Sequence, residues 1–381
     1  MGLVRRIAVL IAFALFLAPA ALLGTAVLTE GQADTSENRS LASWPAWDGS
    51  ARRYTRGVDA FLSDRFGLRM PLIRLARDVR DNLGEDAPAV VRGRDPWLFL
   101  GELAYRDEFE GVGEWDAAQV ERWAESLVEA REALAARGVP LIVTIAPDKA
   151  RIYPEHVPGD WRQGGRRFKQ AVLSHPAVSA FGADVEPAIL DAKARGEAVY
   201  FARDTHWSPS GGAAAARVLL GRLDPEVLHP RPQNAPVADR PAERLYDLEA
   251  MLGEAETSEP TSRRAGFPAL SGYSVTPATV LPDGTPERGA LHTIVVTHDT
   301  DNGASGTLVI VGDSFADSMM PQLAAGYRRV VRIHHGGAAY TVGTDEILSY
   351  DPDAVLLMIV ERSAHRKPRP LVVGPTVRSG G

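Results

Sequence analysis

Two short segments carry side chains of the kinds that act together in nucleophilic catalysis. The first, residues 312–315, reads Gly-Asp-Ser-Phe and directly follows an apolar run, so that Ser314 is expected at a turn between a strand and a helix. In an open α/β sheet a serine at that position lies in the crevice beyond the carboxyl ends of the strands, where its own N–H can face a developing oxyanion. Gly312 is expected to let the chain turn tightly. Taken alone, Gly-Asp-Ser is also a common turn sequence.

The second segment begins at Asp204 and reads Asp-Thr-His-Trp-Ser-Pro. Ser208, followed by proline, predicts the start of a helix that runs to about Arg222, which leaves Asp204 and His206 in the loop before it. Two residues apart in extended backbone, these side chains point to the same side. A carboxylate there can accept a hydrogen bond from one ring nitrogen of His206 and leave the other to act as base toward a hydroxyl. An Asp-x-His pair also occurs in metal sites and in polar loops.

The composition removes several other classes of function. The 381 residues include no cysteine, which excludes disulfides, thiolate metal clusters and a thiol nucleophile. With 42 Lys and Arg against 49 Asp and Glu, the net charge of −7 argues against nucleic acid as a partner, because a phosphate footprint normally shows as a basic excess. His292 and His298 lack the accompanying carboxylates of a zinc hydrolase. We expect neither a metal nor another cofactor.

The pattern of apolar residues predicts the elements that position the two segments. Residues 116–136 carry apolar side chains at three- and four-residue spacing, which indicates an amphipathic helix that Gly138 ends. Four nearly continuous apolar runs are typical of parallel strands buried on both faces: 139–146, 307–311, 330–333 and 354–360. Helical stretches between several of these runs favour an α/β sandwich with a mainly parallel sheet.

The N-terminal segment predicts export. Residues 7–28 form a run of 22 residues without a charge, long enough to cross a bilayer, and Arg5 and Arg6 before it favour an N-terminus in the cytoplasm. The run therefore reads as a single transmembrane helix that anchors the protein in the cell membrane with its body outside the cytoplasm. A signal peptide cleaved after residues 18–20 is the alternative, and it would release the body as a secreted or periplasmic protein.

The rest of the chain divides by composition. Residues 1–28 are the anchor or signal peptide, and the polar residues 29–50 read as a tether. A catalytic domain is expected over residues 51–365. Nine of the 27 prolines lie in residues 230–286, which predicts a proline-rich insertion at about 230–290 that holds one helix over 242–253. A strand is expected over 291–297. Residues 366–381 are basic and read as a solvated tail.

These segments resemble the alginate O-acetyltransferase AlgX/AlgJ family of SGNH-hydrolase-like proteins. The strand followed by Gly-Asp-Ser-Phe and the Asp-x-His-Trp loop carry the resemblance. Further stretches agree over roughly residues 35 to 365: Glu-Asn-Arg-Ser-Leu at 37–41, Asp-Arg-Phe-Gly-Leu-Arg at 64–69, Gly-Arg-Asp-Pro-Trp-Leu-Phe at 93–99, Pro-Asp-Lys at 147–149 and Val-Glu-Arg at 360–362. Each piece is common, and the combination is specific.

The resemblance implies a three-layer SGNH-hydrolase-like sandwich and an exported enzyme that acetylates hydroxyls of a cell-surface or extracellular polysaccharide through an acetyl-serine intermediate. Carried onto this chain, the family triad is Ser314 as nucleophile, His206 as general base and Asp204 as its orienting partner. The order Asp, His, Ser is the circularly permuted one of this family. A membrane-bound O-acyltransferase is the implied partner that supplies acetyl groups. No separate carbohydrate-binding domain is recognised after Arg362.

The sequence leaves the roles of several other residues, and two alternative functions, undecided. The glycine and asparagine blocks that complete the oxyanion hole of ordinary SGNH esterases have no clear counterpart, which leaves Gly336 and Gly337 as weak candidates. Lys149 follows the end of a strand, where it either lines the crevice or forms an ion pair. His334 and His335 are expected in structural or surface roles. The same triad would serve an esterase or deacetylase, and a non-catalytic polysaccharide-binding component of an export complex is the third hypothesis.

Overall fold

The computed structural model describes residues 88–223, 243–252, 263–265, 273–277, 293–298, 305–335 and 340–378, together with residues 44, 45, 47, 54, 55, 57, 58 and 61. The chain divides into two compact units, one of residues 1–89 and 245–262, the other of residues 90–244 and 263–381. In the first unit, the rings of Trp44 and Phe61 meet edge to face at 5.1 Å. This unit also contains the helix α10 (Asp247–Leu252).

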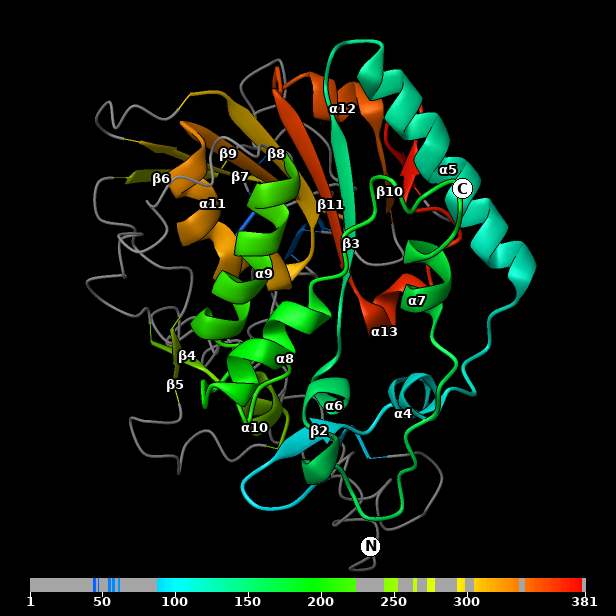
Figure 1. Cartoon of the computed structure of the whole chain (residues 1–381). Coiled ribbons are helices and arrows are strands. Elements are labelled where there is room, and N and C mark those ends of the chain that lie inside the picture. Colours follow the sequence, from blue (N-terminus) through cyan, green and yellow to red (C-terminus); the bar gives the residue numbers. More distant parts are fainter. Residues whose placement is uncertain are drawn as a thin grey trace, which may run out of the picture. The chain divides into compact units, whose positions relative to one another are not determined.

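The second unit is built on a six-stranded sheet in the order β3-β11-β8-β9-β7-β6 (Figure 1). Strands β3, β11, β8 and β9 run parallel to one another, while β7 pairs antiparallel with both β9 and β6. Only β7 therefore runs against the others. The strands are β3 (Leu141–Ala146), β6 (Tyr273–Pro277), β7 (Thr293–His298), β8 (Thr307–Gly312), β9 (Arg329–His334) and β11 (Ala354–Val360).

The four neighbouring parallel strands, β3, β11, β8 and β9, were all predicted from their apolar runs. Every residue of β3 and β11 is buried, as is most of β8 and β9, because helices cover both faces of this part of the sheet. Burial on both faces is why these strands read as continuous apolar runs instead of alternating patterns. The mainly parallel α/β sheet expected from the sequence is confirmed.

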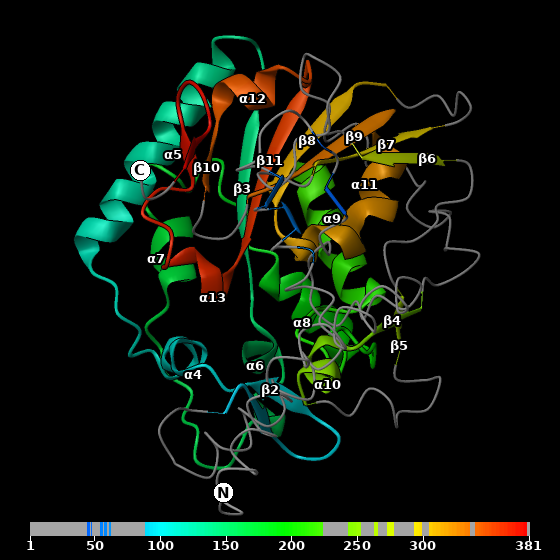
Figure 2. The ribbon, with the colours of Figure 1, turned by 180° about the vertical axis from the view of Figure 1, so that it is seen from behind.

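The helices form layers on the two faces of the sheet (Figures 1 and 2). The connection from β8 to β9 passes through α11 (Met320–Gly326), and the connection from β9 to β11 passes through α12 (Thr344–Leu348). These two connections cross the sheet in opposite directions. Because crossovers between parallel strands are right-handed, α11 and α12 lie on opposite faces. The helix α9 (Pro209–Leu223) packs with α11, and α5 (Ala117–Ala135) packs with α12.

The helix α5 shows how the sequence sets a boundary of an element. Asp116 is its N-cap, and the carboxylate accepts a hydrogen bond from the backbone N–H of Gln119 at 2.8 Å. Its apolar stripe is buried as predicted, and Gly138 follows the helix with a φ of 76° that favours glycine. The remaining short helices are α4 (Leu103–Glu110), α6 (Lys149–Ile152), η1 (Pro154–His156), α7 (Phe168–Leu173), α8 (Glu186–Ala194) and α13 (Glu361–Ala364).

The proline-rich region contains more regular structure than its composition indicated. The strand predicted over 291–297 is found as β7, but β6 was missed, because it is short and ends at Pro277 on the edge of the sheet, where a proline is tolerated. The helix predicted over 242–253 is shorter, since the short strand β4 (Glu243–Leu245) precedes α10 and pairs with β5 (Arg263–Ala265). The boundaries of the insertion stay a prediction.

The segment after residue 365 packs onto the protein. The carbonyl oxygens of Lys367 and Leu371 accept hydrogen bonds from the side chains of Trp123 and Ser126 of α5. Lys367 and Leu371 are themselves buried. The expectation of a solvated tail is therefore wrong for this part. Small strands complete the fold: β10 (Tyr340–Gly343) pairs with β12 (Leu371–Val372) and β13 (Val377–Arg378), and β1 (Val90–Arg92) pairs with β2 (Leu98–Leu100).

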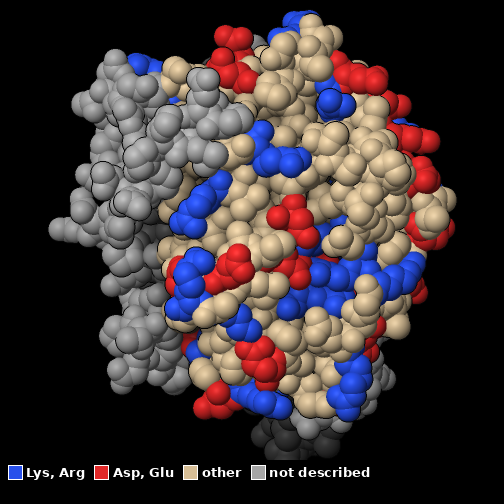
Figure 3. Space-filling model, in the orientation of Figure 1, with Lys and Arg blue, Asp and Glu red and all other residues tan. Residues whose placement is uncertain are grey.

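None of the helices among the described residues is both long and apolar enough to span a bilayer. The predicted transmembrane segment, residues 7–28, lies outside the described residues. Acidic and basic side chains are interspersed on the face of the molecule shown in Figure 3. Such mixing agrees with the ion pairs of the second unit, such as Arg167, which bridges Glu186 and Glu361.

Candidate active site

The loop that carries Asp204 and His206 is shaped by the start of α9. Ser208 caps this helix, as predicted: its Oγ accepts from the backbone N–H of Gly211 at 3.3 Å and donates to the carbonyl of Ala198 at 2.5 Å. A backbone bridge between Tyr200 and Trp207 then folds the chain back on itself. The two halves of the loop are held together at its base, so the residues at its tip have little freedom to move.

Ser314 stands at the carboxyl end of β8, at the start of a 3₁₀ helix, η4 (Ser314–Met319). Asp313 caps η4, because its Oδ1 accepts from the backbone N–H of Phe315 at 3.0 Å. Its Oδ2 accepts from the N–H of Val360 at the end of β11, at 2.8 Å. Gly312 has no positive φ, so the turn at Ser314 is set by the Asp313 side chain and not by the conformational freedom of glycine.

The structure brings the three predicted residues together in one chain of hydrogen bonds. Oδ1 of Asp204 lies 2.7 Å from Nδ1 of His206, and Nε2 of the same ring lies 2.6 Å from Oγ of Ser314. Oδ1 also accepts from the backbone N–H of His206 at 2.9 Å, which fixes the carboxylate. Asp204 and His206 are buried, whereas Ser314 is only partly buried. The hydroxyl is thus the member of the chain that an incoming molecule reaches.

This arrangement is suited to the activation of a hydroxyl nucleophile. The carboxylate holds the Nδ1–H tautomer of His206, which leaves the lone pair of Nε2 facing the Ser314 hydroxyl. Proton transfer to Nε2 makes Ser314 a stronger nucleophile, and the neighbouring carboxylate stabilises the imidazolium that results. Both ring nitrogens of His206 therefore have a partner, Nδ1 in Asp204 and Nε2 in Ser314.

The helix α9 and the nucleophile turn are packed directly against each other. The indole N–H of Trp207 donates to the carbonyl of Phe315 at 2.9 Å, and the two rings meet edge to face at 5.1 Å. Gly212 allows the close approach, because a Cβ at that position would lie 2.6 Å from the carbonyl oxygen of Ser318 on η4. These contacts set the separation of His206 and Ser314, which are 108 residues apart in the sequence.

Lys149 lies behind the Asp204 loop. Its side chain is buried, and Nζ donates to the carbonyl oxygens of Phe201, Ala202 and Asp204 at 3.3, 3.1 and 2.8 Å. The ammonium also lies 4.9 Å from the centre of the Phe99 ring. Lys149 therefore holds the backbone of the loop from within and is not part of an exposed crevice wall. The sequence predicted that Lys149 lies near the site, but not that it donates hydrogen bonds to the backbone of the Asp204 loop.

The other predicted residues have different outcomes. Gly336 and Gly337 lie outside the described residues, so their contribution to an oxyanion hole stays a prediction. His335 is buried beside the nucleophile turn, with Nε2 at 3.6 Å from Oδ2 of Asp313. Although burial alone would raise the pKa of Asp313, His335 and the backbone N–H groups of Val360 and Phe315 hold that pKa below its ordinary value.

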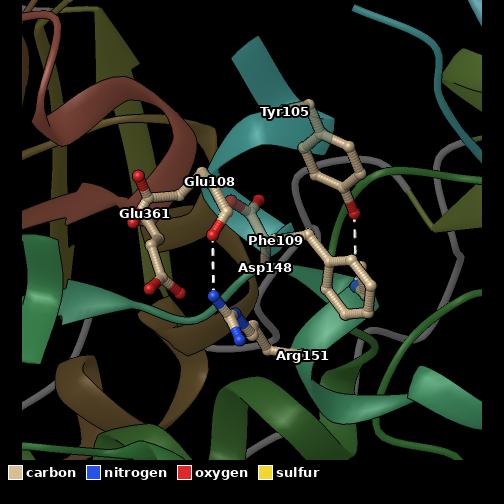
Figure 4. A pocket seen from close by; sticks show the side chains of 7 residues that line it. Tyr105, Glu108, Phe109, Asp148, Arg151 and Glu361 are labelled. Atoms are coloured by element: carbon tan, nitrogen blue, oxygen red, sulfur yellow. Dashed lines mark hydrogen bonds between the residues drawn. The ribbon is translucent and has the colours of Figure 1, made fainter. Parts of the chain in front are cut away.

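A second group of buried charges was missed by sequence reasoning. A pocket at the carboxyl ends of β3 and β11 is lined by the side chains shown in Figure 4, and we call it the carboxylate pocket: Tyr105, Glu108, Phe109, Asp148, Ala150, Arg151 and Glu361. The guanidinium of Arg151 donates to the carbonyl of Glu108 at 2.7 Å, and the Tyr105 hydroxyl accepts from the N–H of Ala150 at 3.2 Å.

The carboxylate pocket changes the acidity of its members. Burial raises the pKa of Glu108 to about 7, with a further contribution from the nearby Glu361. Burial also raises the pKa of Asp148 to about 6, although Arg362 opposes this shift through a hydrogen bond of 2.6 Å from Nη1 to Oδ1. This pair connects the pocket to the nucleophile turn, because the Arg362 guanidinium lies 5.1 Å from the centre of the Phe315 ring.

Comparison with known sequences identifies the family. A family model described as the SGNH hydrolase-like domain of the acetyltransferase AlgX matches residues 90–283, a range that contains Asp204 and His206 and ends before Ser314. The probable alginate O-acetylase AlgJ of Pseudomonas fluorescens is 31% identical over 191 residues, which cover 48% of this chain and 45% of that protein. AlgJ of Pseudomonas aeruginosa is 33% identical over 137 residues, which cover 35% of this chain and 33% of that protein. The chain thus spans less than half the length of these curated relatives.

Solved structures show a more distant similarity. The O-acetyltransferase domain of Pseudomonas putida AlgJ is 20% identical and superposes with a TM-score of 0.44, covering 74% of this chain and 94% of that one. Bacillus cereus PatB1 is 14% identical with a TM-score of 0.47, covering 71% of this chain and 95% of that one. The family assignment rests on the sequence match, which extends over more than half of the chain. The protein belongs to the AlgX family of SGNH hydrolase-like acetyltransferase domains, as the resemblance in its motifs predicted.

Proposed function

We propose that the protein is an exported O-acetyltransferase that acetylates hydroxyls of a cell-surface or extracellular polysaccharide through an acetyl-serine intermediate. The observation that carries the proposal is the chain of hydrogen bonds from Asp204 through His206 to Ser314, with separations of 2.7 and 2.6 Å. Membership of the AlgX family and the similarity to proteins named alginate O-acetylases support acetyl transfer to a polysaccharide.

The reaction takes place in two half-reactions. In the first, Nε2 of His206 removes the Ser314 proton as Oγ attacks the acetyl carbonyl, and the imidazolium then returns that proton to the leaving group. In the second, the same nitrogen removes the proton of a sugar hydroxyl, which attacks the acetyl-serine and releases Ser314. Asp204 keeps the imidazole in one orientation throughout. These two half-reactions need no redox step and no cofactor.

The acetyl donor and the position of the protein belong to the same proposal. A membrane-bound O-acyltransferase is the partner proposed to supply acetyl groups outside the cytoplasm. The uncharged run of residues 7–28 supports a single-pass anchor in the cell membrane, with the catalytic body on the periplasmic or extracytoplasmic side. Protease accessibility of the body in spheroplasts tests this placement, and a protected body in sealed cells and spheroplasts alike would contradict it.

Intact-mass measurement on the purified full chain, mixed with an activated acetyl ester, tests the nucleophile. We expect one acetyl adduct on the wild-type protein and none on Ser314→Ala, because no other residue of the triad can hold the acyl group as a stable ester. Ser318→Ala is the matched control, since this serine lies on the same 3₁₀ helix and is not part of the triad. It should be acetylated like the wild type.

The fate of the adduct separates transfer from hydrolysis. The triad geometry alone serves both reactions, so candidate oligosaccharides must be added to the acetylated protein. Appearance of acetylated oligosaccharide supports the transferase. Release of acetate at the same rate with and without every acceptor would favour an esterase or deacetylase, and a wild-type protein that forms no adduct would favour a non-catalytic polysaccharide-binding component.

A further inference from the structure

We propose that Arg362 is a catalytic residue that donates hydrogen bonds to the acyl oxygen as negative charge develops on it during attack by Ser314. This inference rests on the proposed acyl-serine chemistry and adds a residue outside the triad. In the step concerned, the bond from Oγ to the acyl carbon forms, the carbonyl π electrons move to the oxygen, and the Ser314 proton moves to His206. The oxygen then carries a full negative charge that needs fixed donors.

The sheet places Arg362 beside the nucleophile. Strands β11 and β8 are parallel neighbours, and Met358 pairs with Gly312 in their register. Ser314 lies two residues beyond that pair on one strand, and Arg362 lies four residues beyond it on the other. Parallel strands end at the same edge of a sheet, where ligands of open α/β folds bind. The hydrogen bond from the N–H of Val360 to Asp313 ties the two strand ends together at this level.

Two contacts fix the direction of the Arg362 side chain. Nη1 donates to Oδ1 of Asp148 at 2.6 Å, and the guanidinium lies over the ring of Phe315, the residue that follows the nucleophile. The His206 ring contacts the same phenyl ring, with ring centres 4.9 Å apart. The base and the guanidinium are therefore both within about 5 Å of the centre of one buried ring, next to Ser314.

Arg362 also keeps hydrogen-bond donors for a ligand. A guanidinium has five N–H groups, and among the described residues only Nη1 of Arg362 has a side-chain hydrogen-bond acceptor, the Asp148 carboxylate. Its side chain is 17% exposed. Arg167, in contrast, places its guanidinium on both Glu186 and Glu361. Arg362 thus uses one terminal nitrogen in an ion pair, whereas all three guanidinium nitrogens of Arg167 donate to carboxylates.

The charge at this position is permanent. Burial alone would lower the pKa of Arg362, but the Asp148 carboxylate holds that pKa above its ordinary value. An imidazolium donor would lose its proton near neutral pH, and this guanidinium does not. Arg362 and the backbone N–H of Ser314 together would give the acyl oxygen two donors, from neighbouring strand ends.

Acylation by p-nitrophenyl acetate tests the assignment without any polysaccharide. We expect Arg362→Gln to lower the acylation rate of Ser314 roughly 10²- to 10³-fold, with KM for the ester changed less than about threefold, because the interaction forms mainly in the transition state. The acylation rate of Arg362→Lys should lie between those of the wild type and Arg362→Gln. Guanidinium ion at millimolar concentration should partly restore the rate of Arg362→Ala.

Two further variants keep the test decisive if the glutamine variant does not fold. Removing Arg362 alone leaves Asp148 buried without its partner, which is destabilising. The double variant Asp148→Asn with Arg362→Gln removes that charge and should be folded and slow. Arg329→Gln is the matched control, since Arg329 also lies over an aromatic ring, that of Tyr350, but at the opposite end of the sheet. It should acylate at the wild-type rate.

Each outcome has a separate meaning. A folded Arg362 variant that acylates at the wild-type rate, or a rate loss equal to that of Arg329→Gln, would overturn the role of Arg362 and leave the proposed function standing. A wild-type chain that forms no acetyl-Ser314 would contradict the proposed function itself. Slow acylation by a folded Arg362→Ala variant that guanidinium partly restores, together with slow acylation by the folded double variant, would support the assignment.

Discussion

The triad and the carboxylate pocket lie at the same edge of one sheet, and both bury charged groups, but the two regions satisfy them to different extents. In the triad, Oδ1 of Asp204 accepts two hydrogen bonds from His206, whose ring in turn reaches Ser314. In the carboxylate pocket, Oε2 of Glu108 and Oδ2 of Asp148 are buried and have no hydrogen-bond partner among the described residues. In the triad the hydrogen bonds orient the reacting groups, whereas in the carboxylate pocket two carboxylates each bury an oxygen without a hydrogen bond, which is unfavourable.

This difference assigns the two regions to different properties of the protein. A fully paired group resists movement, so the triad is preorganised for one reaction. Burial raises the pKa of Glu108 to about 7 and that of Asp148 to about 6, so both carboxyl groups change their charge near neutral pH. The carboxylate pocket therefore makes the stability of the folded protein depend on pH. Asp148 and Lys149 are consecutive residues at the start of α6, and they serve the pocket and the triad loop respectively.

The largest effect is expected from Asp204→Asn, which breaks the paired side of the comparison. The amide can donate to Nδ1 and so favours the wrong tautomer of His206, which removes the base while leaving the volume unchanged. We expect the acylation rate with an activated ester to fall roughly 10³- to 10⁴-fold with little change in KM. Asp353→Asn is the matched control, because Asp353 accepts from the N–H of Thr307 at the other end of the sheet. A comparable loss in both variants would show that Asp204 acts only through folding.

The sequence was sufficient to predict the triad because each of its members is fixed by local structure. Ser314 follows a strand that reads as buried, and Asp204 and His206 precede a helix whose N-cap is visible as Ser-Pro. The carboxylate pocket depends instead on which strands are neighbours. Asp148 and Arg362 meet across 214 residues because β3 lies next to β11, and apolar runs do not reveal the order of strands in a sheet.

A moderate effect is expected from Lys149→Met, which tests whether the triad loop depends on its internal support. Methionine is close to lysine in size but removes the charged donor that Nζ provides to the carbonyl oxygens of Phe201, Ala202 and Asp204. We expect a loss of about 2 kcal/mol in unfolding free energy and a roughly tenfold slower acylation, since hydrogen bonds to a charged group contribute about 1.5–3 kcal/mol. Urea denaturation and acylation rates measure the two effects.

Lys169→Met separates this support from stability in general. Lys169 is also fully buried, but its Nζ pairs with Asp184 and Glu186, away from the Asp204 loop. This variant should lose stability and keep the acylation rate. If both variants slow acylation equally, the support of the loop by Lys149 is not specific.

The smallest effect on the acylation rate is expected from Glu108→Gln, which removes a charge from the carboxylate pocket. Glu108 has a pKa of about 7 in the folded protein against 4.5 for an ordinary glutamate, so the folded state binds the proton more tightly. Its contribution to stability is therefore complete below about pH 4.5 and is lost as the pH rises through 7. Relative to the variant, the wild type should gain up to ~3 kcal/mol between pH 8 and pH 5, at about 1.4 kcal/mol per pKa unit.

Urea denaturation of both proteins at pH 5 and pH 8 measures this difference, and Glu186→Gln supplies a control of opposite sign. Hydrogen bonds and charges from Arg167 and Lys169 outweigh burial and lower the pKa of Glu186 to about 2. Its contribution is present in full above pH 4.5 and lost only in stronger acid, so the cost of Glu186→Gln should be the same at pH 5 and pH 8. An equal cost of Glu108→Gln at the two pH values would mean that the pocket carboxylates ionise normally. The contrast between the triad and the carboxylate pocket would then not extend to the acidity of their groups, because Oε2 of Glu108 would have in solution the hydrogen-bond partner that it lacks in this structure.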